Sequence, residues 1–93
     1  MISIELFASL EHCIETVARD EFRSSVGRYL EGGLGDKELE EKIELLKAFL
    51  ESADFGRLRS QSEAYLVKGK KVKFVICWRE EQAHCQMVVV EGA

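Results

Sequence analysis

The chain has 93 residues, of which 46% are hydrophobic and 32% are charged, and its net charge is −4. This length supports one hydrophobic core, so we expect residues 1–93 to form a single domain. The apolar content excludes an intrinsically disordered chain, and no apolar run approaches the ~20 residues that a membrane-spanning helix needs.

Cysteine usage and the first residues of the chain indicate a cellular compartment. Three cysteines, Cys13, Cys77 and Cys85, are too few and odd in number for the disulfide framework of a small secreted domain. The first positive charge is Arg19, whereas a secretion signal places basic residues before its apolar segment. We therefore expect a cytoplasmic protein with reduced thiols and no contact with a membrane.

Charge is distributed unevenly along the chain. Residues 1–56 carry thirteen acidic and six basic side chains, a net of −7. Residues 57–79 carry seven basic side chains against Glu63 alone, a net of +6, and residues 80–93 add −3. This separation of charge is the least ordinary feature of the chain, and it makes the basic segment a candidate binding surface.

Residues 6–31 are predicted to form a long helix. Nine apolar positions recur mostly at steps of three and four along one stripe: Leu6, Leu10, Cys13, Ile14, Val17, Phe22, Val26, Tyr29 and Leu30. Gly32-Gly33 should end this helix, because glycine readily takes the left-handed conformation of a helix terminus. Residues 1–7 have a second interpretation, since Ile2, Ile4 and Leu6 also alternate as in a strand.

Residues 37–52 are predicted to form a second helix. Asp36 stands at its N-cap position, where a carboxylate can accept hydrogen bonds from free backbone amides. The helix has an apolar stripe that we expect to be mostly buried: Leu39, Ile43, Leu46, Phe49 and Leu50. Two antiparallel helices joined by a glycine-rich turn make a helical hairpin.

From about residue 64 the hydrophobic period changes to two, which is typical of strands. Residues 71–79 should form the central strand of a sheet. Residues 65–67 should precede it across the short link Lys68–Lys70, and residues 83–90 should follow it across a turn centred on Glu80-Glu81. Residues 57–63 fit either a loop or the frayed start of a strand.

The register of these turns divides the sheet into two faces. The face expected to pack on the helices carries Tyr65, Val67, Val72, Phe74, Ile76, Trp78, Cys85, Met87 and Val89. The second face carries Leu66, Lys71, Lys73, Val75, Cys77, His84, Gln86 and Val88. The predicted fold is therefore α+β, with an N-terminal antiparallel helical hairpin packed on one face of a C-terminal three-stranded antiparallel β-meander.

The chain offers no recognisable metal or cofactor motif. Zinc sites usually have paired ligands at short spacings such as C-x2-C, which the histidines and cysteines here do not form. His12 and Cys13 would diverge by about 100° on a helix, and His84 and Cys85 would point to opposite faces of a strand. The common nucleotide and hydrolase signatures are also absent, so we expect neither a metal nor a cofactor.

One pair of residues has the geometry for catalysis. In the predicted register Cys77 faces His84 across two strands, as a thiolate and its base would. A catalytic dyad also needs an orienting third group and a pocket, and neither is indicated. A non-enzyme is therefore expected, and an enzymatic or small-ligand site near Cys77 and His84 is kept as an alternative.

A second alternative is a nucleic-acid-binding protein that uses a basic hairpin. Its phosphate contacts would come from Arg57, Arg59, Lys68, Lys70, Lys71 and Lys73. Against it stand the acidic balance of the whole chain and the expected burial of Phe74 and Trp78, which removes them from base stacking. Nucleic acid is therefore not the favoured partner.

The leading hypothesis is a non-enzymatic interaction or regulatory module that forms a homodimer. The second sheet face carries Leu66, Val75 and Val88, which makes it more apolar than contact with water alone requires. An unbroken helix over residues 4–31 would span about 42 Å, against ~30 Å for a globule of this size. Either this helix breaks, or its start overhangs and exposes Leu6 and Leu10. A two-fold related copy is the commonest way to cover such surfaces.

Overall fold

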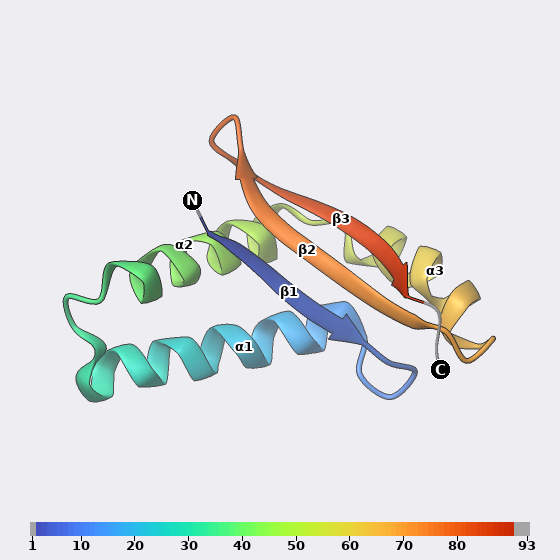
Figure 1. Cartoon of the computed structure of the whole chain (residues 1–93), viewed down its shortest axis with the longest axis horizontal. Coiled ribbons are helices and arrows are strands. Elements are labelled where there is room, and N and C mark those ends of the chain that lie inside the picture. The colour runs from blue at the N-terminus through green and yellow to red at the C-terminus, as the bar shows by residue number, and fades with distance from the viewer. Residues whose placement is uncertain (1, 91–93) are drawn as a thin grey trace.

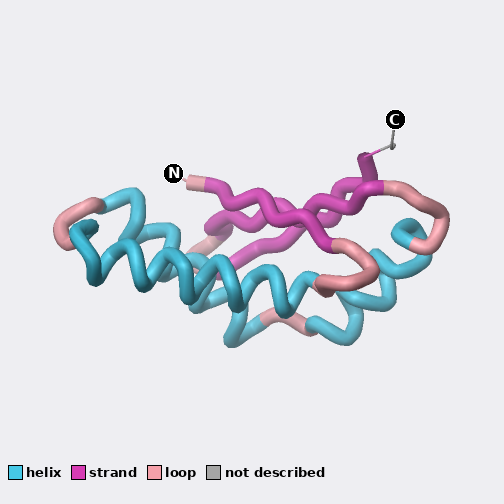
Figure 2. Tube along the Cα trace, turned by 90° about the horizontal axis from the view of Figure 1, so that it is seen from below, coloured by secondary structure: helices cyan, strands magenta, loops and turns pink. Residues whose placement is uncertain are grey.

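The protein folds into two layers, a three-stranded antiparallel sheet and a layer of helices on one of its faces (Figures 1 and 2). A computed structural model describes residues 2–90. In chain order the elements are β1 (Ser3–Ala8), α1 (Ile14–Arg28), the π-helical turn η1 (Tyr29–Gly33), α2 (Lys37–Ser52), α3 (Phe55–Leu66), β2 (Lys71–Arg79) and β3 (Gln82–Val90). The predicted α+β class is confirmed, and β2 is the central strand as expected.

Strand β1 corrects the prediction that a helix begins at residue 6. Ile4, Leu6 and Ala8 are buried and the residues between them are exposed, which is the period of two that a strand requires. Leu6 pairs with Phe74 of β2. The prediction failed because residues 2–10 fit both periods locally, and only pairing with β2 decides between them. Leu10, expected on the same buried stripe, is 64% exposed.

Helix α1 is shorter than the predicted helix of residues 6–31. It has 15 residues, with Cys13 as its N-cap, and therefore spans about 22 Å. Of the two alternatives for residues 4–31, the break is the one observed, because β1 and α1 are separate elements and Leu6 lies in the core. The helical hairpin instead extends past the sheet at its turn, where Leu30 and Leu34 are exposed (Figure 1), and the described residues measure 43 × 28 × 23 Å.

Helix α2 follows the sequence prediction closely. The carboxylate of Asp36 caps it by accepting a hydrogen bond from the Leu39 amide at 3.2 Å. Leu46 and Phe49 of the predicted stripe are buried, and Leu39, Ile43 and Leu50 are half-buried. The hydroxyl of Tyr29 donates to Glu40 at 2.8 Å, and this bond ties α2 to the end of α1.

Helix α3 replaces the predicted strand of residues 65–67 and the undecided segment 57–63. Asp54 caps it by accepting a hydrogen bond from the Arg57 amide at 3.1 Å. Its inner face combines half-buried Phe55, Leu58 and Leu66 with Ser62, which is 3% exposed. The helix was missed because this serine stands where an apolar residue would have shown the helical period.

The link at residues 68–70 is therefore the end of a helix and not the turn of a hairpin. Gly69 has a φ of +81°, the left-handed conformation in which helices commonly terminate. Leu66, expected on the second sheet face, belongs to α3 and is half-buried against the core. The third strand of the sheet is β1, contributed from the other end of the chain.

The β2–β3 hairpin agrees with the sequence prediction. Glu80 and Glu81 both have positive φ, at 52° and 66°, which is the geometry of a two-residue type I′ turn. Arg79 pairs with Gln82, and Cys77 with His84. On the helix-facing side of β2, Val72, Phe74 and Ile76 are completely buried.

The helices cover the sheet unequally. Along β3 the helix-facing side chains of Ala83, Cys85, Met87 and Val89 are only half-buried. Of their partners on β2, Val72, Phe74 and Ile76 are buried and Trp78 is half-buried. In Figure 2 the helices lie on one side of the sheet and leave the other side bare. Within residues 2–90 no helix has the length and apolar character needed to cross a membrane.

Candidate functional site

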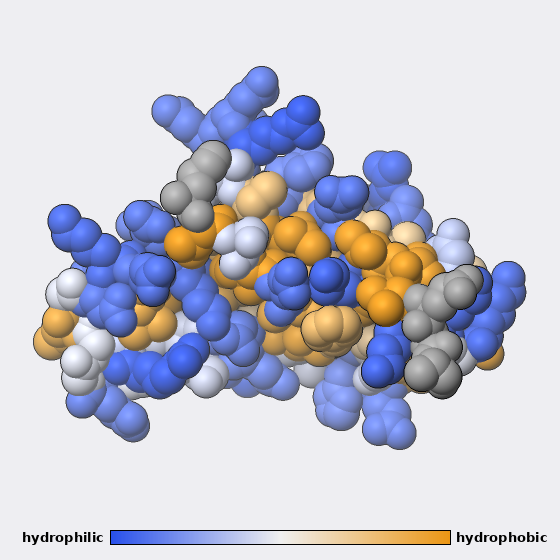
Figure 3. Space-filling model, viewed as in Figure 1, coloured by the Kyte–Doolittle hydropathy of each residue, from blue (hydrophilic) through white to orange (hydrophobic). Residues whose placement is uncertain are grey.

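The sheet face without helices is one candidate surface, which we call the open face. Strand alternation places on it the outward residues of β1, β2 and β3. Apolar side chains gather across it in Figure 3. The open face carries Phe7, Val75, Cys77, Val88 and Val90 among the polar residues Ser3, Glu5, Lys71, Lys73, Arg79, Gln82, His84 and Gln86.

Charge on the open face is partly neutralised. Lys73 Nζ lies 3.6 Å from Glu5 Oε1, and the Lys73 side chain is 24% exposed. Its register neighbours are Phe7 on one side and Val88 on the other, and Phe7 is 54% exposed. The stem of Lys73 therefore runs between two apolar side chains, and its charge is directed to Glu5.

Cys77 and His84 face each other on the open face, as the sequence predicted. Cys77 is half-buried and His84 is exposed. Ser3 is the partner of Cys77 on the other side, in β1. The neighbouring Cys85 points to the helices, and burial, with a smaller contribution from Cys77, raises the pKa of its thiol to about 11, so this sulfur stays protonated at neutral pH.

The predicted basic residues are distributed over several surfaces. Arg57 and Arg59 lie on α3, Lys68 and Lys70 in the turn after it, and Lys71 and Lys73 on β2. Arg57 borders a hollow beside Ala83 and Cys85 of β3. Lys70 and Lys71 border a different hollow next to Ala8 and Leu10. The segment therefore does not fold into the basic hairpin that the sequence indicated.

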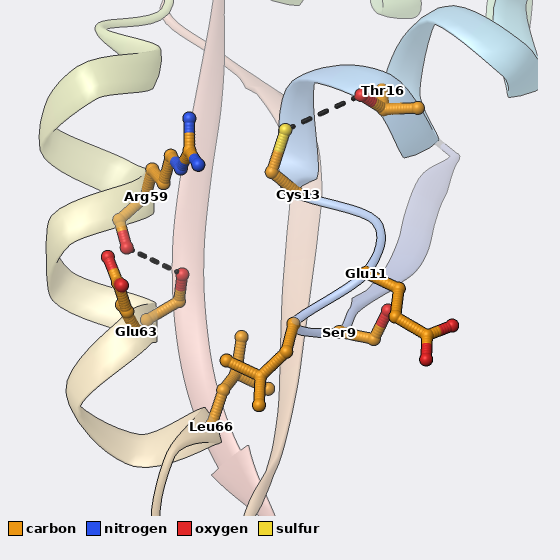
Figure 4. A pocket seen from close by; sticks show the side chains of 9 residues that line it. Ser9, Glu11, Cys13, Thr16, Arg59, Glu63 and Leu66 are labelled. Atoms are coloured by element: carbon orange, nitrogen blue, oxygen red, sulfur yellow. Dashed lines mark hydrogen bonds between the residues drawn. The ribbon is translucent and has the colours of Figure 1, made fainter.

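A small hollow of about 120 Å³ lies between the β1–α1 loop and α3 (Figure 4). One wall comes from the loop and the start of α1, and the other from α3. The loop is closed by hydrogen bonds between Ser9 and His12, from Ser9 N–H to the His12 carbonyl at 2.9 Å and from His12 N–H to Ser9 Oγ at 3.0 Å. The lining residues are Ser9, Leu10, Glu11, Cys13, Thr16, Arg59, Ser62, Glu63 and Leu66.

Cys13 is the chemically distinctive residue of this hollow. Its Sγ lies 3.5 Å from the Thr16 hydroxyl. Hydrogen bonds from the Thr16 side chain and backbone lower the pKa of the Cys13 thiol, with smaller contributions from the Glu15 amide and the positive charge of Arg59. The N-terminus of a helix favours a thiolate in the same way. The arrangement favours the thiolate of Cys13, whereas burial disfavours the thiolate of Cys85.

The described residues provide no group of ligands for a metal. Among residues 2–90, no three histidine, cysteine, aspartate or glutamate side chains lie close enough together to hold an ion.

A protein-family model matches residues 2–90, which is nearly the whole chain. The chain belongs to this family. No curated protein and no solved structure gives a significant match.

Two features of this family member were missed by the sequence analysis. Phe7 belongs to the segment for which helix and strand were both open, and it is exposed on the open face because β1 is a strand. Cys13 was expected on a buried helical stripe, but it stands at the N-cap position of α1 and lines the same hollow as Arg59. A signal for the second existed in the chain, because a polar loop followed by a new apolar period at Ile14 is typical of a helix start.

Proposed function

We propose that this protein is a non-enzymatic interaction module that self-associates as a homodimer through the side of the sheet bearing β3. The observation that carries the proposal is that β3 keeps apolar side chains incompletely covered on both of its faces. Cys85, Met87 and Val89 are half-buried toward the helices, and Val88 and Val90 lie on the open face.

Incomplete cover of a strand is costly for a small domain. Apolar surface left in water forgoes roughly 25 cal/mol per Å², and β3 exposes such surface along most of its length. A partner that covers both faces of this strand would recover part of that free energy. The mixed apolar and polar composition of the region is typical of interfaces between proteins that also exist separately.

The placement of the cations makes nucleic acid the weaker proposal. Lys73 is engaged by Glu5, and Arg59 lies in the Cys13 hollow behind the sheet. Phe74 is completely buried and Trp78 packs against the core, so neither presents its ring for base stacking. Binding to phosphates would have to rely on scattered charges, and such binding weakens steeply with salt.

Light scattering coupled to size-exclusion chromatography tests the proposal. At micromolar concentration the protein should show about twice its 10.6 kDa monomer mass, and the mass should persist in moderate salt because apolar contacts dominate. A monomer at every concentration would refute self-association. A dimer that dissociates in moderate salt would refute the apolar contact and point instead to pairing between the acidic helices and the basic segment.

A further inference from the structure

Strand β3 is an edge strand without the usual protection against pairing. It has nine residues, Gln82–Val90, with sequence QAHCQMVVV, and it lies at one side of the sheet (Figure 1). It contains no proline, lysine, arginine, aspartate or glutamate. Edge strands are normally short, charged or bulged so that they do not pair with another chain. The opposite edge, β1, has six residues and carries Glu5.

The backbone groups that β3 offers follow from the hairpin. In an antiparallel ladder alternate residues direct their N–H and C=O groups to the partner strand. A type I′ turn is closed by a hydrogen-bonded pair, here Arg79 with Gln82. The N–H and C=O groups of the even-numbered residues of β3 therefore point to β2. The free edge presents the N–H and C=O groups of Ala83, Cys85, Met87 and Val89, the same residues whose side chains are half-buried.

We propose that a second copy of this chain pairs with β3 in antiparallel orientation about a two-fold axis at Gln86, so that two three-stranded sheets join into one of six strands. This inference rests on the proposed self-association and specifies its interface. The two open faces become one continuous surface across the joint. On the other side, the half-buried side chains of the two β3 strands cover each other.

The register follows from the strand itself. Gln86 is the midpoint of Gln82–Val90, so a two-fold axis there pairs all nine residues with their copies. Cys85 then meets Met87 of the second copy, and Ala83 meets Val89, each through groups that face the free edge. If one strand slipped by a single residue against the other, residues whose backbone groups face the free edge would pair with residues whose backbone groups face β2. If the two-fold axis moved from Gln86 to a neighbouring residue, two residues of each strand would be left unpaired.

The dimensions of the molecule set an upper limit on the area of this contact. Nine strand residues extend about 30 Å, and the molecule is 23 Å along its shortest axis. The side of the molecule at β3 therefore measures on the order of 600 Å² per copy, and the contact can bury at most roughly 1,200 Å² in total, which lies at the lower end of specific interfaces.

Charge decides between this contact and packing of the open faces on each other. The open face carries Glu5, Lys71, Lys73 and Arg79, and face-to-face packing would remove all four from water at a cost. Pairing at β3 leaves them solvated. Because β3 has no formally charged residue, no like charges oppose each other across the two-fold axis. The β3 edge of a second, identical copy can therefore pair with this edge without repulsion between charged side chains.

A charge-exchange experiment at Gln86 tests the register. Gln86 is exposed, and a two-fold axis places it opposite its own copy, with Cα atoms about 4.5 Å apart in a non-hydrogen-bonded pair. Like charges at such a position are destabilising. Gln86→Lys and Gln86→Glu should each raise the dimer dissociation constant by about tenfold or more, and an equimolar mixture of the two variants should restore a dimer. Ser3→Lys, the same change of charge at the β1 edge, should leave dissociation unchanged.

The possible results separate the two proposals. A monomeric wild type would overturn self-association and this interface together. A wild-type dimer that tolerates both Gln86 variants would overturn pairing at β3 and leave self-association standing. Dissociation of each variant without recovery in the mixture would overturn the two-fold register. An equal effect of Ser3→Lys would overturn the placement of the contact at β3.

Hydrogen exchange of the wild-type protein gives an independent test that needs no substitution. The amides of Ala83, Cys85, Met87 and Val89 should exchange slowly when the dimer is populated and much faster on dilution to the monomer. Equal exchange of these four amides at both concentrations would overturn the interface.

Discussion

Replacing Leu6 with alanine should destabilise the protein far more than the same replacement at Leu10. Leu6 is 5% exposed and pairs with Phe74 in the core, whereas Leu10 is 64% exposed. Leucine-to-alanine replacements in cores cost about 2–5 kcal/mol, of which the lost methyl and methylene groups contribute ~0.8 kcal/mol each and the remaining cavity contributes the rest. Because β1 is an edge strand that can relax inward, about 3 kcal/mol is expected for Leu6→Ala and less than ~0.5 kcal/mol for Leu10→Ala.

Urea denaturation followed by Trp78 fluorescence and circular dichroism measures this difference. With a slope of about 1–1.5 kcal/mol per molar urea, Leu6→Ala should lower the midpoint by roughly 2–3 M, and it should lower Tm by roughly 12–24 °C. Both variants must be compared at one protein concentration, because self-association adds to stability. Similar losses at Leu6 and Leu10 would refute strand β1 and favour the helix over residues 6–31 that the apolar spacing alone predicts.

Four further predictions concern other elements. Leu46→Ala, at a completely buried position of α2, should cost about 2–5 kcal/mol, and a loss below ~1 kcal/mol in urea denaturation would mean that this stripe faces solvent. Asp36→Ala removes the cap of α2 and should cost about 1 kcal/mol, whereas an unchanged midpoint would show that the cap contributes nothing. Folding raises the pKa of Cys85 from 9.0 to about 11, so the folded protein holds this proton more tightly than the unfolded chain. The free energy of unfolding should therefore fall as the pH rises from 9 to 11. In Cys85→Ala this part of the pH dependence should be lost. The lowered pKa of Cys13 predicts that iodoacetamide modifies it before Cys85 at neutral pH and that Thr16→Val slows the reaction, and mass spectrometry showing Cys85 modified first would contradict this.

Several elements were predictable because their signals are local. The Asp36 cap and the apolar stripe of α2 lie within a few turns of one helix, so their physics does not depend on the rest of the chain. The β2–β3 hairpin is similar, because a two-residue turn fixes the register, and alternation then assigns each side chain to a face. For this reason the pairing of Cys77 with His84 could be predicted from the sequence.

The surfaces offered for binding depended on contacts that are distant in sequence. The basic segment looked like one patch because its charges are close along the chain, but α3 and β2 direct them to different sides of the molecule. The hollow at Cys13 exists only because α3 brings Arg59 beside the start of α1, and no local pattern encodes that approach.

The sequence by itself determined the class of fold, the central strand and the hairpin that ends in β3. Tertiary structure decided the identity of the third strand, because residues 3–8 satisfy a helical and an extended period equally well until β2 offers them hydrogen bonds. Tertiary structure also decided that residues 55–66 form helix α3, because Ser62 occupies a buried position there and hides the helical period. Placing β1 beside β2 makes β3 the other edge of the sheet, and an edge is a property of the assembled sheet because it consists of the backbone groups that no other strand has paired.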